Sequence, residues 1–190
     1  MAVKASEHFK TYHNPNGPDI TTLTRPVIEQ NGLYFKDIDG TGTVSAVNDW
    51  RLPSAERAAA YVKELTVDEK IAQLFISDWR MGPKYPSPRL PGHAYQADES
   101  GCVDEAEVNQ KTIFGEQHLP GTTTLIKDWF ARHTIVRENA QPEDMADYLN
   151  QLQAIAEGCE RFVPVQVASN SRNENGEIVF GMNDAGGVYP

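Results

Sequence analysis

Residues 134–168, TIVRENAQPEDMADYLNQLQAIAEGCERFVPVQVA, decide the fold class because they hold one complete strand–helix–strand pattern. Residues 134–136 are all β-branched, as is typical of a short strand. Pro142 stands where a helix tolerates proline, at its first position, and Gly158 is placed to end that helix. The apolar residues between them recur at helical spacing: Met145, Tyr148, Leu149, Leu152 and Ile155. Residues 162–168 are then predicted to form the next strand.

The same alternation is predicted upstream. Residues 54–65 and 122–133 have helical periodicity, Thr66 and Glu69 form a capping box that opens another helix, and residues 74–76 are predicted to be a buried strand. A loop rich in proline and glycine follows at 80–101, and a short helix is predicted around 104–113. Helices that alternate with short apolar strands favour an α/β fold with a parallel sheet or barrel.

A closed barrel takes eight such units over roughly 250 residues. The chain has 190 residues, so we expect an incomplete (β/α) barrel that holds its first roughly three βα units. Residues 53–190 are assigned to this truncated barrel domain. Residues 1–32 are polar and interrupted by Asn14-Pro15-Asn16-Gly17-Pro18, which predicts an extended N-terminal arm that lies over another part of the molecule or is loose.

Residues 33–52 form an acidic, glycine-rich segment that opens like the calcium loop of an EF-hand. Its oxygen ligands would come from Asp37, Asp39, Thr41, Thr43 and Asn48, with Gly42 at the position of the turn glycine. Asn48 replaces the usual bidentate glutamate, and fewer carboxylates weaken calcium binding. The segment predicts either a weak structural calcium site or an acidic turn that needs no metal. No other cofactor is expected.

The charge balance limits the class of partner. The chain has 27 acidic residues against 17 Lys and Arg, a formal net charge of −10. A nucleic-acid binder needs basic surface to neutralise phosphates, and an acidic surface is equally unsuited to anionic lipid. No apolar run reaches transmembrane length. We therefore expect neither a nucleic acid nor a membrane as a partner.

The N-terminal residues contain no apolar stretch that could serve as a signal peptide. We therefore expect a cytoplasmic protein, or a periplasmic or secreted one if a signal was removed. Cys102 and Cys159 are too few for a disulfide framework and are expected to be free thiols. The five histidines show neither metal-ligand spacing nor a neighbouring nucleophile.

Two groups of motifs resemble a known family. The first comprises residues 35–44 (FKDIDGTGTV), 49–53 (DWRLP) and 65–74 (LTVDEKIAQL). The second comprises residues 135–139 (IVREN), 150–157 (NQLQAIAE), 163–165 (VPV) and 168–173 (ASNSRN). In this order and spacing, they resemble the N-terminal part of glycoside hydrolase family 3, of the β-glucosidase type.

The resemblance implies a (β/α)₈-type barrel, a following α/β sandwich domain, and exo-acting, retaining hydrolysis of terminal β-linked sugars by two carboxylates. It places both catalytic carboxylates in later parts of such an enzyme. The chain alone is therefore expected to be inactive, and no catalytic residue is assigned. Ser77-Asp78-Trp79 spells the nucleophile tripeptide of the family, but it precedes the segments that the nucleophile should follow. Asp78 is kept only as a candidate.

The resemblance also implies sugar-binding residues after the later strands. Asn170 falls where similar enzymes often carry an aspartate that holds the terminal sugar, and Arg172 and Asp184 are candidates to serve in its place. Arg137, at another predicted strand end, is a fourth candidate. The expected partners are an oligosaccharide or β-glucoside, the remainder of the barrel with its sandwich domain, and a second copy in a homo-oligomer. The alternative function is a non-catalytic carbohydrate-binding or interaction module.

Overall fold

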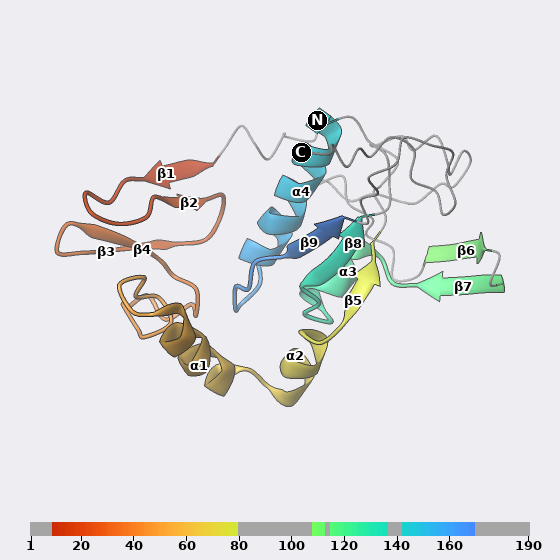
Figure 1. Cartoon of the computed structure of the whole chain (residues 1–190), viewed down its shortest axis with the longest axis horizontal. Helices are drawn as coiled ribbons and strands as arrows, with labels where there is room; N and C mark the ends of the chain where they lie inside the picture. Colours follow the sequence, from red (N-terminus) through yellow and green to blue (C-terminus); the bar gives the residue numbers. More distant parts are fainter. Residues whose placement is uncertain (1–8, 80–107, 113–114, 137–141, 170–190) are drawn as a thin grey trace, which may run out of the picture.

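The computed structural model describes residues 9–79, 108–112, 115–136 and 142–169 (Figure 1). Near the N-terminus lie the strands β1 (Lys10–Tyr12), β2 (Ile20–Thr22), β3 (Val27–Gln30) and β4 (Leu33–Lys36), then the helices α1 (Ser54–Glu64) and α2 (Val67–Ala72). The rest comprises β5 (Ile76–Asp78), β6 (Val108–Thr112), β7 (Gly115–Leu119), α3 (Thr122–Lys127), β8 (His133–Val136), α4 (Pro142–Glu157) and β9 (Gln166–Ser169).

A parallel three-stranded sheet with the order β5-β8-β9 is the centre of the fold. The helices α3 and α4 occupy the connections between its strands, as the sequence predicted for a chain of βα units. The other sheets are two-stranded and antiparallel. The described residues thus form a mixed α/β structure, and they contain no closed barrel.

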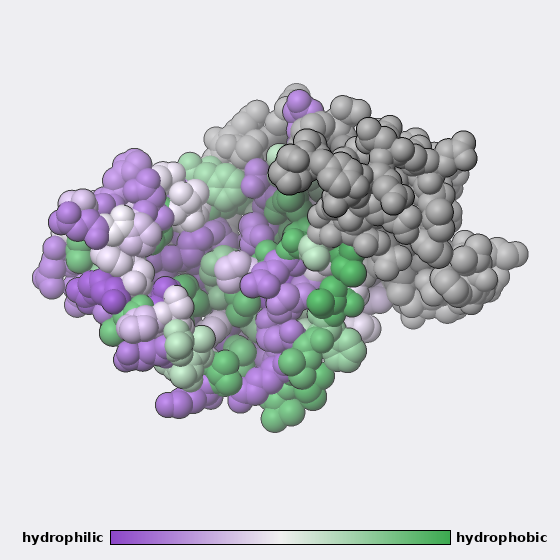
Figure 2. Space-filling model, viewed as in Figure 1, coloured by the Kyte–Doolittle hydropathy of each residue, from purple (hydrophilic) through white to green (hydrophobic). Residues whose placement is uncertain are grey.

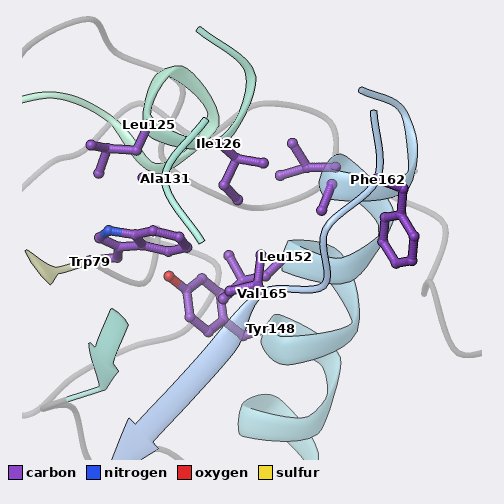
Figure 3. Close-up of a cluster of buried hydrophobic side chains, with 10 residues drawn as sticks. Trp79, Leu125, Ile126, Ala131, Tyr148, Leu152, Phe162 and Val165 are labelled. Atoms are coloured by element: carbon purple, nitrogen blue, oxygen red, sulfur yellow. The ribbon is translucent and has the colours of Figure 1, made fainter. Parts of the chain in front are cut away.

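The core lies between this sheet, α3 and α4 (Figure 3). Tyr148, Leu152 and Ile155 lie on one face of α4, at the spacing that the sequence predicted, and are buried. Ile126 of α3 and Trp79, directly after β5, meet them there. Burial of large apolar side chains contributes about 1.5–3 kcal/mol each, so this cluster supplies the main stabilisation of the βα units.

The structure corrects three local predictions. Residues 108–112 form the strand β6, paired with β7, in place of the end of a helix. The helix α3 ends at Lys127 and not near His133, because Phe130 adopts a left-handed backbone conformation with φ 55° that no helix can continue through. Residues 74–76 are exposed instead of buried: the exposed fraction is 83% for Leu74, 63% for Phe75 and 62% for Ile76.

The starts of α1 and α2 lie where the sequence predicted them. The capping box is confirmed, since the Thr66 hydroxyl accepts from the backbone of Glu69 and the Glu69 carboxylate accepts from the backbone of Thr66. Ser54, where the sequence predicted the first helix to begin, is the first residue of α1. Pro53 occupies the cap position and makes no side-chain bond there.

The predicted arm contains two β-hairpins, β1–β2 and β3–β4. Asn31 and Gly32 form the two-residue turn of the second hairpin with φ values of 54° and 75°, which are the conformations that an Asn-Gly hairpin turn needs. The loop between the hairpins lies on the C-terminal end of α4, where Glu157 accepts bonds from the backbones of Leu23 and Thr24.

Two buried charged residues make this attachment. The Glu157 carboxylate also binds Lys36 Nζ at 2.6 Å and the Thr22 hydroxyl at 3.1 Å. The Arg25 guanidinium donates to the carbonyls of Asp37, Ile38, Glu157, Cys159 and Glu160. Free carbonyls at a helix end need donors, and Arg25 supplies them.

None of the helices in the described ranges is long and apolar enough to cross a bilayer.

Candidate functional site

The carboxyl ends of the three parallel strands define the candidate site. The parallel register pairs Asp78 of β5 with Ile135 of β8, and Val136 of β8 with Ser169 of β9. The last residues of the three strands therefore lie along one edge of the sheet. In parallel α/β sheets and barrels, ligands bind at this edge, because the loops that follow the strands meet there.

Side-chain hydrogen bonds fix the chain as it leaves β5. The Thr134 hydroxyl donates to the Ser77 carbonyl at 3.0 Å and accepts from the Trp79 backbone at 3.3 Å. The indole Nε1 of Trp79 donates to the Ser77 hydroxyl at 2.6 Å, and the ring is buried in the core. These bonds anchor the residues on both sides of Asp78. Trp79 therefore packs in the core.

The predicted sugar-binding residues continue from these strand ends. Asp78 is the last residue of β5. Arg137 comes directly after β8, and Asn170 comes directly after β9, but both lie outside the described residues. Arg172 and Asp184 also lie outside them. The sugar-binding assignment of Arg137, Asn170, Arg172 and Asp184 stays a prediction, as does the candidacy of Asp78.

The acidic segment at 37–48 is closed by its own hydrogen bonds. The Asp39 carboxylate accepts from the hydroxyls of Thr41 and Ser45 and from the Asn48 side-chain amide. Burial by itself raises the pKa of Asp39, but these bonds outweigh it and hold the pKa below its usual value. The backbone of Gly42 donates to Asp37 Oδ2 at 3.1 Å. The carboxylates of Asp37 and Asp39 thus already accept hydrogen bonds from protein donors, which a calcium ion would have to displace.

The side-chain amide of Asn48 is held at three points within this segment. Its Oδ1 accepts from the Ile38 backbone at 2.8 Å, and its Nδ2 donates to Asp39 Oδ1 at 2.8 Å and to the Thr43 carbonyl at 2.9 Å. Rotating the amide by 180° would place oxygen against oxygen, so the network fixes its orientation. The loop therefore receives N–H groups from Asn48 where a cation would need oxygen.

No group of three or more His, Cys, Asp or Glu side chains that could hold a metal occurs within the described part of the chain. The hydrogen bonds within residues 37–48 are those of a closed acidic turn. The calcium assignment to Asp37, Asp39, Thr41, Thr43 and Asn48 stays a prediction.

A buried arginine at the opposite end of the sheet was not predicted. Arg132 immediately precedes β8 and is fully buried; its Nη1 donates to the carbonyls of Ile126 and Ala131, and its guanidinium lies 4.0 Å from the Phe130 ring centroid. Burial lowers the pKa of Arg132 below its usual value. Residues at the amino ends of parallel strands contribute to stability, whereas ligand binding and catalysis take place at the carboxyl ends. In the sequence, Arg132 lay within the predicted helix 122–133, and no pattern distinguished it there.

The comparisons with known proteins agree with a glycosidase relationship. The chain is 29% identical over 162 residues to the periplasmic beta-glucosidase/beta-xylosidase of Dickeya chrysanthemi. The match covers 84% of this chain and 21% of that protein, so the chain spans about a fifth of the length of its curated relative. No protein-family model matches the sequence. The chain is a distant homologue of one part of this enzyme.

Proposed function

We propose that the chain is the N-terminal portion of the barrel domain of an exo-acting, retaining β-glycosidase of the glycoside hydrolase family 3, β-glucosidase type. The observation that carries the proposal is the distant homology over 162 residues to a beta-glucosidase/beta-xylosidase. The parallel order β5-β8-β9 supports it, because successive βα units in this order are the repeating element of a (β/α) barrel.

In this proposal the strand ends contribute to a sugar pocket. Asn170, Arg172, Asp184 and Arg137 would donate or accept hydrogen bonds with sugar hydroxyls, which are donors and acceptors at once. Asp78 would line the same edge. The nucleophile and the acid/base would come from chain that corresponds to the relative's remaining four-fifths. The two carboxylates of a retaining enzyme must flank one glycosidic bond, about 5–5.5 Å apart.

Hydrolysis of an aryl glycoside tests the proposal. The 190-residue chain is compared with a longer product that reads through to the natural stop codon of its gene, on p-nitrophenyl β-D-glucoside and the matching β-D-xyloside. We expect only the longer product to release nitrophenol. Turnover by the 190 residues alone would overturn the placement of the catalytic carboxylates. In that case, Asp78→Asn would show whether Asp78 is the nucleophile.

A longer product that binds the glycoside without cleaving it would favour the non-catalytic carbohydrate-binding module.

The sequence supports the proposed partners and location. The ligand is a β-glucoside or oligosaccharide, and the remaining barrel is a structural partner. The protein is cytoplasmic, or periplasmic or secreted if a signal was removed. The relative is named as a periplasmic enzyme. Fusion of the complete gene product to a reporter that is active in one compartment would decide between cytoplasm and periplasm.

A further inference from the structure

Thr134 is a buried residue of β8 that uses its hydroxyl on the neighbouring strand. The side chain is 1% exposed, and a buried hydroxyl needs partners. Both of its bonds go to the backbone of one strand end, since it donates to the Ser77 carbonyl and accepts from the Trp79 amide. One side chain of β8 thus contacts the chain on both sides of Asp78, the last residue of β5.

The strand β5 has few other constraints. It pairs with β8 over three residues, Ile76–Asp78, and it lies at one edge of the three-stranded sheet within the described part of the chain. Figure 2 shows hydrophobic residues at the surface over α2 and the start of β5, where Ile76 is mostly exposed. Trp79, directly after the strand, is 1% exposed. The strand is therefore open at its start and held at its end, where the Thr134 hydroxyl binds.

Strand propensity alone does not explain a threonine at this position. Threonine and valine have nearly the same shape, and both are favoured in strands. The register pairs Thr134 with Ser77 on one side and with Val167 on the other, and Val167 packs against the core. A valine would suit that apolar surrounding, but the buried Trp79 amide would lose the acceptor that the hydroxyl supplies. The hydroxyl therefore has a role that side-chain shape does not provide.

We propose that Thr134 is a positioning residue of the candidate site: through the backbones of Ser77 and Trp79, its hydroxyl holds the carboxyl end of β5 where that end contributes to the sugar pocket. The inference rests on the proposed function, which places a sugar pocket at this edge of the sheet. Thr134 is too deeply buried to touch a sugar itself. It acts on sugar binding by fixing the place of a strand end that lines the pocket.

Thr134→Val and Thr134→Ser form a matched pair of variants. Valine keeps the shape of the side chain and loses the hydroxyl, whereas serine keeps the hydroxyl and loses the methyl group. Amide hydrogen exchange of the 190-residue chain, followed by nuclear magnetic resonance without sugar, tests the positioning itself. Thr134→Val should lower the protection of the Trp79 amide about 3- to 10-fold, the equivalent of one hydrogen bond, and Thr134→Ser should restore it. Unchanged protection in Thr134→Val, or an equal loss in both variants, overturns the proposal.

Kinetics of the longer gene product on the p-nitrophenyl glycosides test the consequence for sugar binding. Thr134→Val should raise KM about 3- to 10-fold with kcat little changed, because it removes an interaction that supports binding. Thr134→Ser should recover the KM, although the lost methyl group lowers its Tm. Variants that differ from the unmodified enzyme in Tm but not in KM would show a merely structural role and overturn the proposal. If the unmodified longer product neither binds nor cleaves a glycoside while the exchange result holds, the proposed function is overturned and the fixing of the β5 end by Thr134 is not.

Discussion

Replacing Glu157 by glutamine should cost more stability than any surface change in this chain. Glu157 has a side chain only 3% exposed, and its carboxylate accepts from Lys36 Nζ, the Thr22 hydroxyl and the backbones of Leu23, Thr24 and Arg25. An amide has one acceptor oxygen and one NH₂ group. In either orientation of glutamine, the NH₂ group faces donors, so either the Lys36 ammonium or the backbone N–H groups lose their acceptor.

Breaking a buried ion pair by removing one partner costs about 3–5 kcal/mol. For a chain of this size, each kcal/mol lowers Tm by roughly 2–4 °C, so Glu157→Gln should lower Tm by at least about 6 °C. Urea unfolding followed by tryptophan fluorescence gives the free energy directly. Glu160→Gln makes the same chemical change at an exposed glutamate of the same turn and should stay within about 0.5 kcal/mol. If both variants unfold alike, Glu157 does not fasten the hairpins to α4.

Two further predictions concern the contacts of Glu157 and Arg25, and a third concerns those of Asn48. Lys36 and the backbone donors outweigh the effect of burial and lower the pKa of Glu157. The stability advantage of the unmodified chain over Glu157→Gln should therefore be constant above about pH 4.5 and shrink as the pH falls below that value; a constant difference down to pH 3 in urea titrations would refute it. Arg25→Lys should cost about 2 kcal/mol, because an ammonium has three donors for five carbonyls; an unchanged urea midpoint would contradict this. Millimolar calcium should leave the Tm of the unmodified chain unchanged, whereas Asn48→Asp, which replaces the N–H donors by a carboxylate, should be less stable without calcium and gain Tm with it; a calcium-dependent Tm in the unmodified chain would show that residues 37–48 do bind the ion.

Local signals in the sequence predicted the parts of the fold that local chemistry determines. The spacing of apolar residues predicted α4, and the β-branched run before it predicted β8. Thr66 and Glu69 predicted the start of α2 through two short-range bonds. The parallel pairing of β5, β8 and β9 followed from the alternation of strands and helices alone, since that alternation requires parallel strands.

Interactions between distant residues could not be predicted in the same way. Arg25 bonds to the Glu157 carbonyl across 132 positions of sequence, and in the sequence Arg25 stands only beside a proline in a polar stretch. The exposure of Leu74, Phe75 and Ile76 was missed for a related reason. An apolar run indicates that a surface will be covered, but it does not indicate by which part of which chain. The Asn48 amide orientation depends on its bonds to Ile38, Asp39 and Thr43, which no spacing rule specifies.

We propose that the chain supplies part of a sugar pocket at the carboxyl edge of the β5-β8-β9 sheet, and nuclear magnetic resonance of the backbone amides, titrated with methyl β-D-glucoside, tests this. Amide shifts should therefore concentrate at Ser77–Trp79, at Val136 and at Ser169, and the β1–β4 hairpins should not respond. Shifts confined to the hairpins, or no shifts at all, would contradict a sugar-binding role for this edge.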